Sequence, residues 1–81
     1  MNVKVLFFAN LKEIAGQASL DIEVEDGATV SDVKTIIVES FPKLKEVIEK
    51  IFISLNQEMA GKEDTLKDGD EVGLLPPFSG G

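Results

Sequence analysis

Alternation of apolar and polar residues predicts the first two strands of the chain. Residues 3–8 are rich in β-branched and aromatic side chains, and residues 20–25 alternate between apolar and acidic. Successive side chains of a strand point to opposite faces, so each segment has one face toward a core. Residues 10–16 read as a single helical turn that ends at Gly16. We expect the two strands to pair as a hairpin, with Val3, Val5 and Phe7 on one face and Lys4, Leu6 and Phe8 on the other.

The main helix is predicted to start after Thr29. Thr29 and Asp32 have the spacing of a capping box, and apolar residues follow at helical spacing. Pro42 ends this helix, because it disfavours helical geometry at the residue before it and lacks an N–H. Apolar residues then repeat at i, i+3, i+4 and i+7 and predict a second short amphipathic helix. They are Leu44, Val47, Ile48 and Ile51.

The remainder of the chain predicts further strands and then a tail. Strands are expected over 51–55, briefly over 57–60, and over 71–74, with turns at Asn56-Gln57 and at 67–70. The pattern is that of an α+β fold: a mixed sheet of four to five strands with one main helix packed on one face. We expect a single domain, 1–75, and a flexible tail, 76–81, whose prolines and glycines cannot extend a strand.

Composition narrows the function. The 81 residues include no cysteine and no histidine, which removes thiolate chemistry and the commonest general base and metal ligand. An enzyme active site within this chain is therefore not expected. A net charge of −7 disfavours nucleic acid and membrane surfaces and favours a basic protein partner. No targeting or membrane-spanning segment is recognisable, so we expect a cytoplasmic location.

Two segments resemble a phosphate-binding loop and a calcium-binding loop, but their residues do not have the spacing that these sites require. Gly61-Lys62 lacks the earlier glycine and the following hydroxyl residue of a phosphate-binding loop. The acidic residues Asp68, Asp70 and Glu71 lack the alternation and the distal glutamate of a calcium loop. We expect a solvated turn there and no metal.

The carboxyl end is the unusual part of the sequence. Two stiff prolines, an aromatic residue and two glycines follow the last strand as one unit. Six extended residues reach about 20 Å, so such a tail could deliver a carboxylate into a narrow pocket of another protein. The bland alternatives are a frayed end or an engineered linker.

Four segments resemble the MoaD/ThiS family of ubiquitin-like sulfur carriers, which includes the small subunits of molybdopterin synthases. They are residues 5–9, 55–57, 66–72 and 76–81, and the likeness extends over essentially the whole chain. The resemblance implies a β-grasp fold. It also implies that the carboxylate of Gly81, after the side-chain-free Gly80, is adenylated with ATP and converted to a thiocarboxylate. Sulfur would then pass to a cyclic pyranopterin monophosphate to form the molybdopterin dithiolene.

The same resemblance implies which partners supply the catalytic groups. An E1-like (MoeB-like) enzyme would use ATP to activate the terminus, and a MoaE-like large synthase subunit would accept the loaded tail. The chain itself would be a non-catalytic sulfur donor with no bound cofactor. Hinge or anchor roles would fall to Pro76, Pro77, Phe78 and Ser79.

Strand parity adds a candidate partner surface. If Lys4, Ser54 and Glu71 face outward, then so do five apolar side chains, which is more apolar area than a water-facing sheet normally carries. They are Leu6, Phe8, Phe52, Met59 and Leu75. The alternatives are a scatter of exposed apolar residues without a role, or helical segments that cover this face.

Two other functions stay open. The first is a different acceptor: a ThiS-like carrier for thiazole synthesis, or a prokaryotic modifier joined to lysines through Gly81. The second is a non-reactive ubiquitin-like interaction domain. Deletion of Gly81 separates these classes, because it should abolish a carrier and leave a binding module unaffected.

Overall fold

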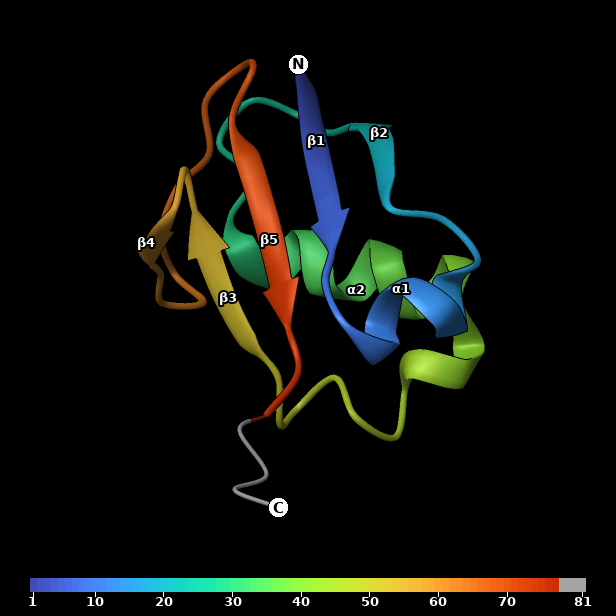
Figure 1. The fold of residues 1–81 in the computed structure, drawn as a ribbon. Coiled ribbons are helices and arrows are strands. Elements are labelled where there is room, and N and C mark those ends of the chain that lie inside the picture. The colour runs from blue at the N-terminus through green and yellow to red at the C-terminus, as the bar shows by residue number, and fades with distance from the viewer. Residues whose placement is uncertain (78–81) are drawn as a thin grey trace.

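The computed structural model describes residues 1–77 and shows one five-stranded sheet with a helix across one face (Figure 1). The helices are α1 (Asn10–Ala15), α2 (Val30–Ser40) and the 3₁₀ helix η1 (Pro42–Leu44). The strands are β1 (Asn2–Phe7), β2 (Ser19–Glu23), β3 (Phe52–Leu55), β4 (Glu58–Met59) and β5 (Glu71–Leu75). The predicted fold class is confirmed.

The strand order β2-β1-β5-β3-β4 places the first and last strands, β1 and β5, side by side in the interior of the sheet. β1 pairs antiparallel with β2 and parallel with β5, and β3 pairs antiparallel with both β5 and β4. The mixed sheet with α2 packed against it is the β-grasp arrangement, as expected. Its last strand ends at Leu75, where the predicted domain ends.

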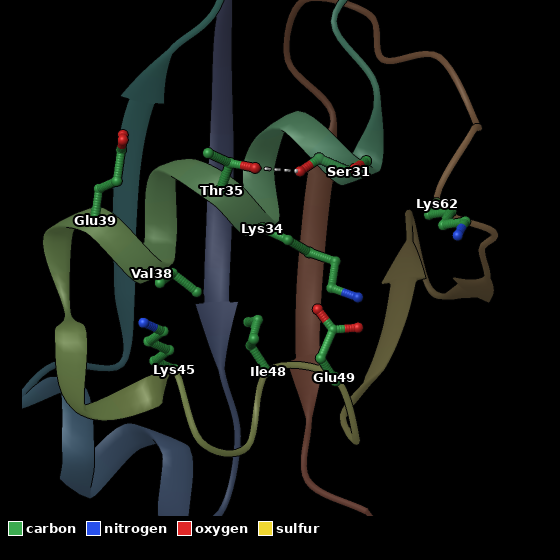
Figure 2. A pocket seen from close by; sticks show the side chains of 9 residues that line it. All are labelled: Ser31, Lys34, Thr35, Val38, Glu39, Lys45, Ile48, Glu49 and Lys62. Atoms are coloured by element: carbon green, nitrogen blue, oxygen red, sulfur yellow. Dashed lines mark hydrogen bonds between the residues drawn. The ribbon is translucent and has the colours of Figure 1, made fainter.

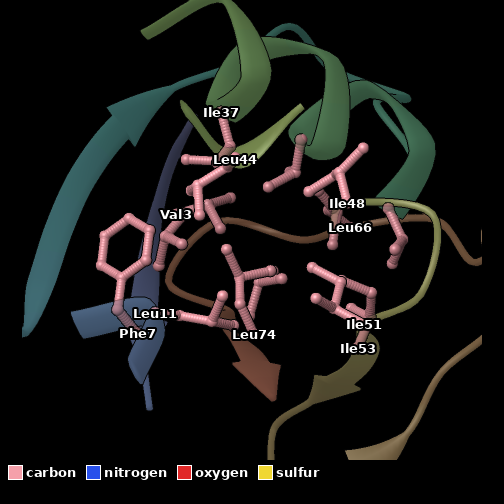
Figure 3. Close-up of a cluster of buried hydrophobic side chains, with 14 of the residues drawn as sticks. Val3, Phe7, Leu11, Ile37, Leu44, Ile48, Ile51, Ile53, Leu66 and Leu74 are labelled. Atoms are coloured by element: carbon pink, nitrogen blue, oxygen red, sulfur yellow. The ribbon is translucent and has the colours of Figure 1, made fainter. Parts of the chain in front are cut away.

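The core lies between α2 and the inner face of the sheet (Figure 3). Val3, Val5 and Phe7 are buried, which confirms the parity predicted for the first strand. Phe7 also meets Phe41 edge to face, with ring centroids 5.5 Å apart. The other side of the sheet therefore carries the even-numbered residues of β1.

The predicted boundaries of the main helix are confirmed. Thr29 N donates to Asp32 Oδ2 at 2.8 Å, which satisfies one of the N–H groups that a helix start leaves unpaired. Helix α2 ends before Pro42, and the N–H of Phe41 closes the last turn on the carbonyl of Ile37 at 2.7 Å. Gly16 ends α1 with a φ of 76°, also as predicted.

The second amphipathic helix is a wrong prediction. Only the 3₁₀ helix η1 and a series of turns occupy residues 42–50, although Leu44, Ile48 and Ile51 are buried as the spacing indicated. Ile48 N to Leu44 O, at 2.9 Å, is the one i→i−4 bond among the loop hydrogen bonds of this segment. So short a segment does not sustain a helix by itself, and its apolar side chains reach the core without one.

Hydrogen bonds tie the two predicted turns to the start of β5. Asn56 and Gln57 both have positive φ, and the Asn56 side chain accepts from Glu71 N and donates to Asp70 Oδ1, each at 3.0 Å. The carboxylate of Asp68 accepts from Asn2 N at 2.7 Å, and that of Asp70 from Lys67 N at 2.7 Å. Both carboxylates therefore hold backbone groups in place.

Candidate partner-docking face

The outer face of the sheet, opposite α2, gathers apolar side chains into two neighbouring rows. In one row, Leu6 lies beside Gly73, Gly73 beside Ser54, and Ser54 beside Met59. In the next row, Leu75 pairs with Phe52, and Phe8 follows β1 on the other side of Leu75. We call these residues the docking face: Leu6, Phe8, Phe52, Ser54, Met59, Gly73 and Leu75.

Three of these side chains are well exposed. The exposed fractions are 41% for Phe8, 47% for Phe52 and 67% for Met59, and these three are the exposed large apolar residues of the described chain. Leu6 and Leu75 are half-buried between them. Aromatic and methionine side chains gathered on one face are typical of the centre of a protein–protein interface. The structure thus brings together the five apolar residues that parity placed there, and no helix within residues 1–77 covers them.

Gly73 lies in the middle of this face, beneath the ring of Phe8. A Cβ atom on Gly73 would lie 3.0 Å from Phe8 Cε2 and closer still to Ser54 Oγ. These are tight approaches, so an alanine here would require the Phe8 ring to give way by a few tenths of an ångström and the Ser54 hydroxyl to rotate. Sequence reasoning missed this role, although a glycine inside a strand is itself a signal of close approach.

The backbone on either side of Phe8 is also held. Phe8 N donates to Leu74 O at 3.2 Å, and its carbonyl accepts from Leu11 N at 3.0 Å. The next residue, Ala9, has φ 51° and ψ −132°, which is costly for a residue with a Cβ atom. This conformation turns the chain from β1 into α1 immediately after Phe8.

The predicted tail begins beside the docking face. Pro76 is half-buried and Pro77 is exposed, and both follow Leu75 outside regular structure. Phe78, Ser79, Gly80 and Gly81 lie outside the described residues, so their predicted roles remain predictions. A tail that leaves β5 starts next to Phe8 and Phe52, because both flank Leu75 in one row.

Two grooves lie elsewhere, on either side of α2. A groove of about 470 Å³ separates α2 from the segment after η1, and Lys34, Lys45 and Lys62 line it together with Glu39 and Glu49 (Figure 2). Figure 2 shows Lys34 from α2 and Glu49 from the opposite wall pointing toward one another. A second groove of similar volume lies between α2 and residues 23–28. Neither is lined by a residue of the docking face.

Two further findings concern residues 1–77. No helix in that range has the length and apolar character needed to cross a membrane. The same range contains no group of three or more potential ligand side chains placed to hold a metal ion. In the acidic turn at 67–70, the carboxylates of Asp68 and Asp70 accept hydrogen bonds from backbone N–H groups.

Comparison with known proteins decides the family. Residues 5–81 match the family model described as the ThiS family. The chain belongs to the ThiS family. Among curated members, the "Molybdopterin synthase sulfur carrier subunit" of Chlamydomonas reinhardtii is 42% identical, and the match spans 100% of both chains.

Solved structures point to two kinds of relative within the same fold. The first is small archaeal modifier protein 1 (SAMP1) from Haloferax volcanii, which has a TM-score of 0.89 at 31% identity, with 100% of both chains covered. Subunits 1 and 2 of the molybdopterin-converting factor from Helicobacter pylori were solved as a protein–protein complex. A chain of that complex has a TM-score of 0.76 at 32% identity, again with full coverage of both chains. Both solved relatives share the fold on which the docking face of this chain is built.

Proposed function

We propose that this protein is the sulfur carrier subunit of a molybdopterin synthase. The observation that carries the proposal is full-length similarity to curated sulfur carrier subunits, at 42% identity for the algal relative. The apolar docking face beside the base of the tail supports it, because a carrier must hold a partner while its terminus reacts inside that partner. The structurally similar Helicobacter pylori chain was solved in a complex of two subunits, which supports a large-subunit partner here.

The proposed chemistry uses the carboxylate of Gly81. A carboxylate is a poor electrophile, so an E1-like enzyme first joins it to AMP from ATP and releases pyrophosphate. A sulfur donor then displaces AMP and leaves a thiocarboxylate, which is a good nucleophile. The loaded terminus enters the large subunit, where its sulfur forms a C–S bond to cyclic pyranopterin monophosphate, and water then cleaves the acyl–sulfur bond and returns Gly81 to a carboxylate.

The catalytic groups belong to the partners in this proposal. The chain has no cysteine or histidine, and its body acts as a handle that positions the terminus. ATP is a substrate of the activating enzyme and is not a cofactor of this chain. The reactions are proposed to take place in the cytoplasm.

Intact-mass measurement tests the chemistry directly. The purified chain is incubated with ATP, a sulfur source and the E1-like enzyme of the same organism. Replacement of one terminal oxygen by sulfur is expected, and a variant that lacks Gly81 should not change in mass. An unchanged wild-type mass with an enzyme that loads another carrier would refute the proposal.

A protein modifier is the second candidate function. The close structural likeness to SAMP1, with a TM-score of 0.89, favours it. It predicts that Gly81 forms isopeptide bonds with lysines of other proteins in cells. Immunoblots of a tagged chain separate the two functions. A modifier gives a ladder of larger conjugates that disappears when Gly81 is deleted, whereas a dedicated sulfur carrier gives no such ladder.

A further inference from the structure

We infer that Gly73 is a positioning residue of the docking face and that it acts through Phe8. The inference rests on the proposed function, since it concerns the surface that holds the large subunit. It goes beyond that function in assigning a role to a residue that has no side chain with which to contact a partner.

The first step is where the ring of Phe8 can lie. Its Cε2 atom occupies space only 3.0 Å from the position of a Cβ on Gly73, so the ring lies over the middle of β5. At 41% exposure, one part of the ring rests on the sheet and the rest faces outward. The Cε2 edge of the ring therefore lies next to Gly73, which is paired with Leu6 on one side and Ser54 on the other.

The second step is that the backbone leaves Phe8 little other freedom. Hydrogen bonds to Leu74 and Leu11 hold its N–H and C=O, and the strained Ala9 follows directly. A methyl group added at Gly73 would therefore require the Ser54 hydroxyl to rotate and the Phe8 ring to shift about its own bonds, away from the sheet. Strain retained next to an exposed aromatic residue suits an anchor whose position matters more than stability.

The third step concerns affinity. An anchor already held in its bound position loses less conformational freedom on binding than a mobile one. Gly73→Ala should lift the ring and weaken the complex, while the core beneath β5 stays intact because Val72 and Leu74 point to the opposite face. Loss of the contact between Phe8 and Gly73 should therefore lower the affinity for the partner more than it lowers the free energy of unfolding.

The position of the ring can be tested without a partner. In NMR spectra of the wild type, the Gly73 Hα resonances should be displaced by the ring current of Phe8 and should move toward ordinary values in Phe8→Ala. Unchanged Gly73 resonances in Phe8→Ala would overturn the inference, whatever the protein binds.

A double-mutant cycle tests the effect on binding. Affinity for the purified large subunit is measured by calorimetry for Gly73→Ala, Phe8→Ala and the double variant. We expect Gly73→Ala to weaken binding about tenfold, as for a residue in the centre of an interface, and to have little further effect once Phe8 is alanine. Equal losses in both backgrounds would overturn the inference.

Two controls separate the ring from other causes. Gly61→Ala makes the same change where no atom lies within 4 Å and φ is ordinary, so it should bind as the wild type does. Ser54→Ala combined with Gly73→Ala removes the Oγ contact and should leave the affinity low. Full recovery in that variant would show that Gly73 acts through Ser54 and would overturn the role of Phe8.

The outcomes also separate this inference from the proposed function. If the wild type shows the ring-current shift but does not bind the large subunit, the assignment as synthase subunit fails and the partner role of Gly73 fails with it. If the wild type binds and Gly73→Ala binds equally well, only the positioning role fails.

Discussion

Individual residues in this protein do structural work that their charge or size alone does not reveal. Asp68 and Asp70 look like cation ligands in the sequence, yet their carboxylates accept hydrogen bonds from the backbone of Asn2 and Lys67. Asn56 also has a structural role, since its side chain accepts a hydrogen bond from Glu71 N and donates one to Asp70 Oδ1. The Asn56 contacts join the β3–β4 turn to the start of β5, the Asp68 contact joins the 67–70 turn to the start of β1, and the Asp70 contact closes that turn.

Replacement of Asn56 should therefore be costly for an exposed residue. Asn56→Ala loses both side-chain hydrogen bonds and places a Cβ-bearing residue less tolerant than asparagine at φ 52°. We expect the free energy of unfolding to fall by about 2 kcal/mol. Urea denaturation measures it, and Asn56→Gly, which keeps the φ without strain, should lose roughly half as much. Identical losses in the two variants would contradict a role for the left-handed conformation.

At the scale of elements, local signals set where α2 begins and ends. Its capping box and the proline after its last turn lie where the sequence placed them, because both act within a few residues. The segment after η1 had a helical apolar pattern but no comparable start signal, and it forms turns. A short apolar repeat is satisfied equally well by turns that bury Leu44 and Ile48.

The capping box gives a prediction for this helix. Asp32→Ala removes the carboxylate that accepts from Thr29 N, and it also removes a negative charge from the first turn of α2. The free energy of unfolding should fall by about 1 kcal/mol. Asp26→Ala removes the same charge from the preceding exposed turn and serves as the control in thermal or urea unfolding. A loss of the same size at Asp26 would show that net charge, and not the cap, is responsible.

The whole molecule separates a buried face of the sheet from an exposed one. Phe7 and Phe8 are neighbours in the sequence, but one packs on Phe41 in the core and the other lies on the docking face. Among the described residues, one side of the sheet thus forms the core and the other side leaves Phe8, Phe52 and Met59 exposed. The base of the tail leaves from the row that contains Phe8, Leu75 and Phe52.

A charge on the docking face should consequently impair binding and spare folding. Phe8→Lys is expected to weaken binding of the large subunit at least tenfold, because the interface would bury an unpaired charge. Circular dichroism and thermal unfolding should stay close to those of the wild type. Ser40→Lys adds the same charge at the exposed end of α2 and should leave binding unchanged. Unfolding of Phe8→Lys would place Phe8 in the core and refute the assignment of faces.

Much of the fold and part of the site were predictable from the sequence. Strand parity, the capping box, the two turns and the five apolar residues of the docking face all follow from patterns that repeat within a few residues. The absence of cysteine and histidine likewise excluded whole classes of chemistry. The function of the last residues was predicted from the resemblance to a family, because Gly80 and Gly81 have no side chains that would indicate what reacts with them.

The sequence predicted that the first two strands pair as a hairpin, which the structure confirms, but only the tertiary structure decided that β5 lies between β1 and β3 and what Gly73 meets. Alternation shows which side chains share a face of one strand, but it is compatible with many strand orders. The parallel pairing of β1 with β5 brings Lys4 beside Glu71, and just before these paired residues Asn2 N donates to Asp68 Oδ1 across 66 positions of the chain. Such pairings depend on how α2 and the whole core pack. The contact between the Phe8 ring and Gly73 therefore forms only once the sheet is assembled.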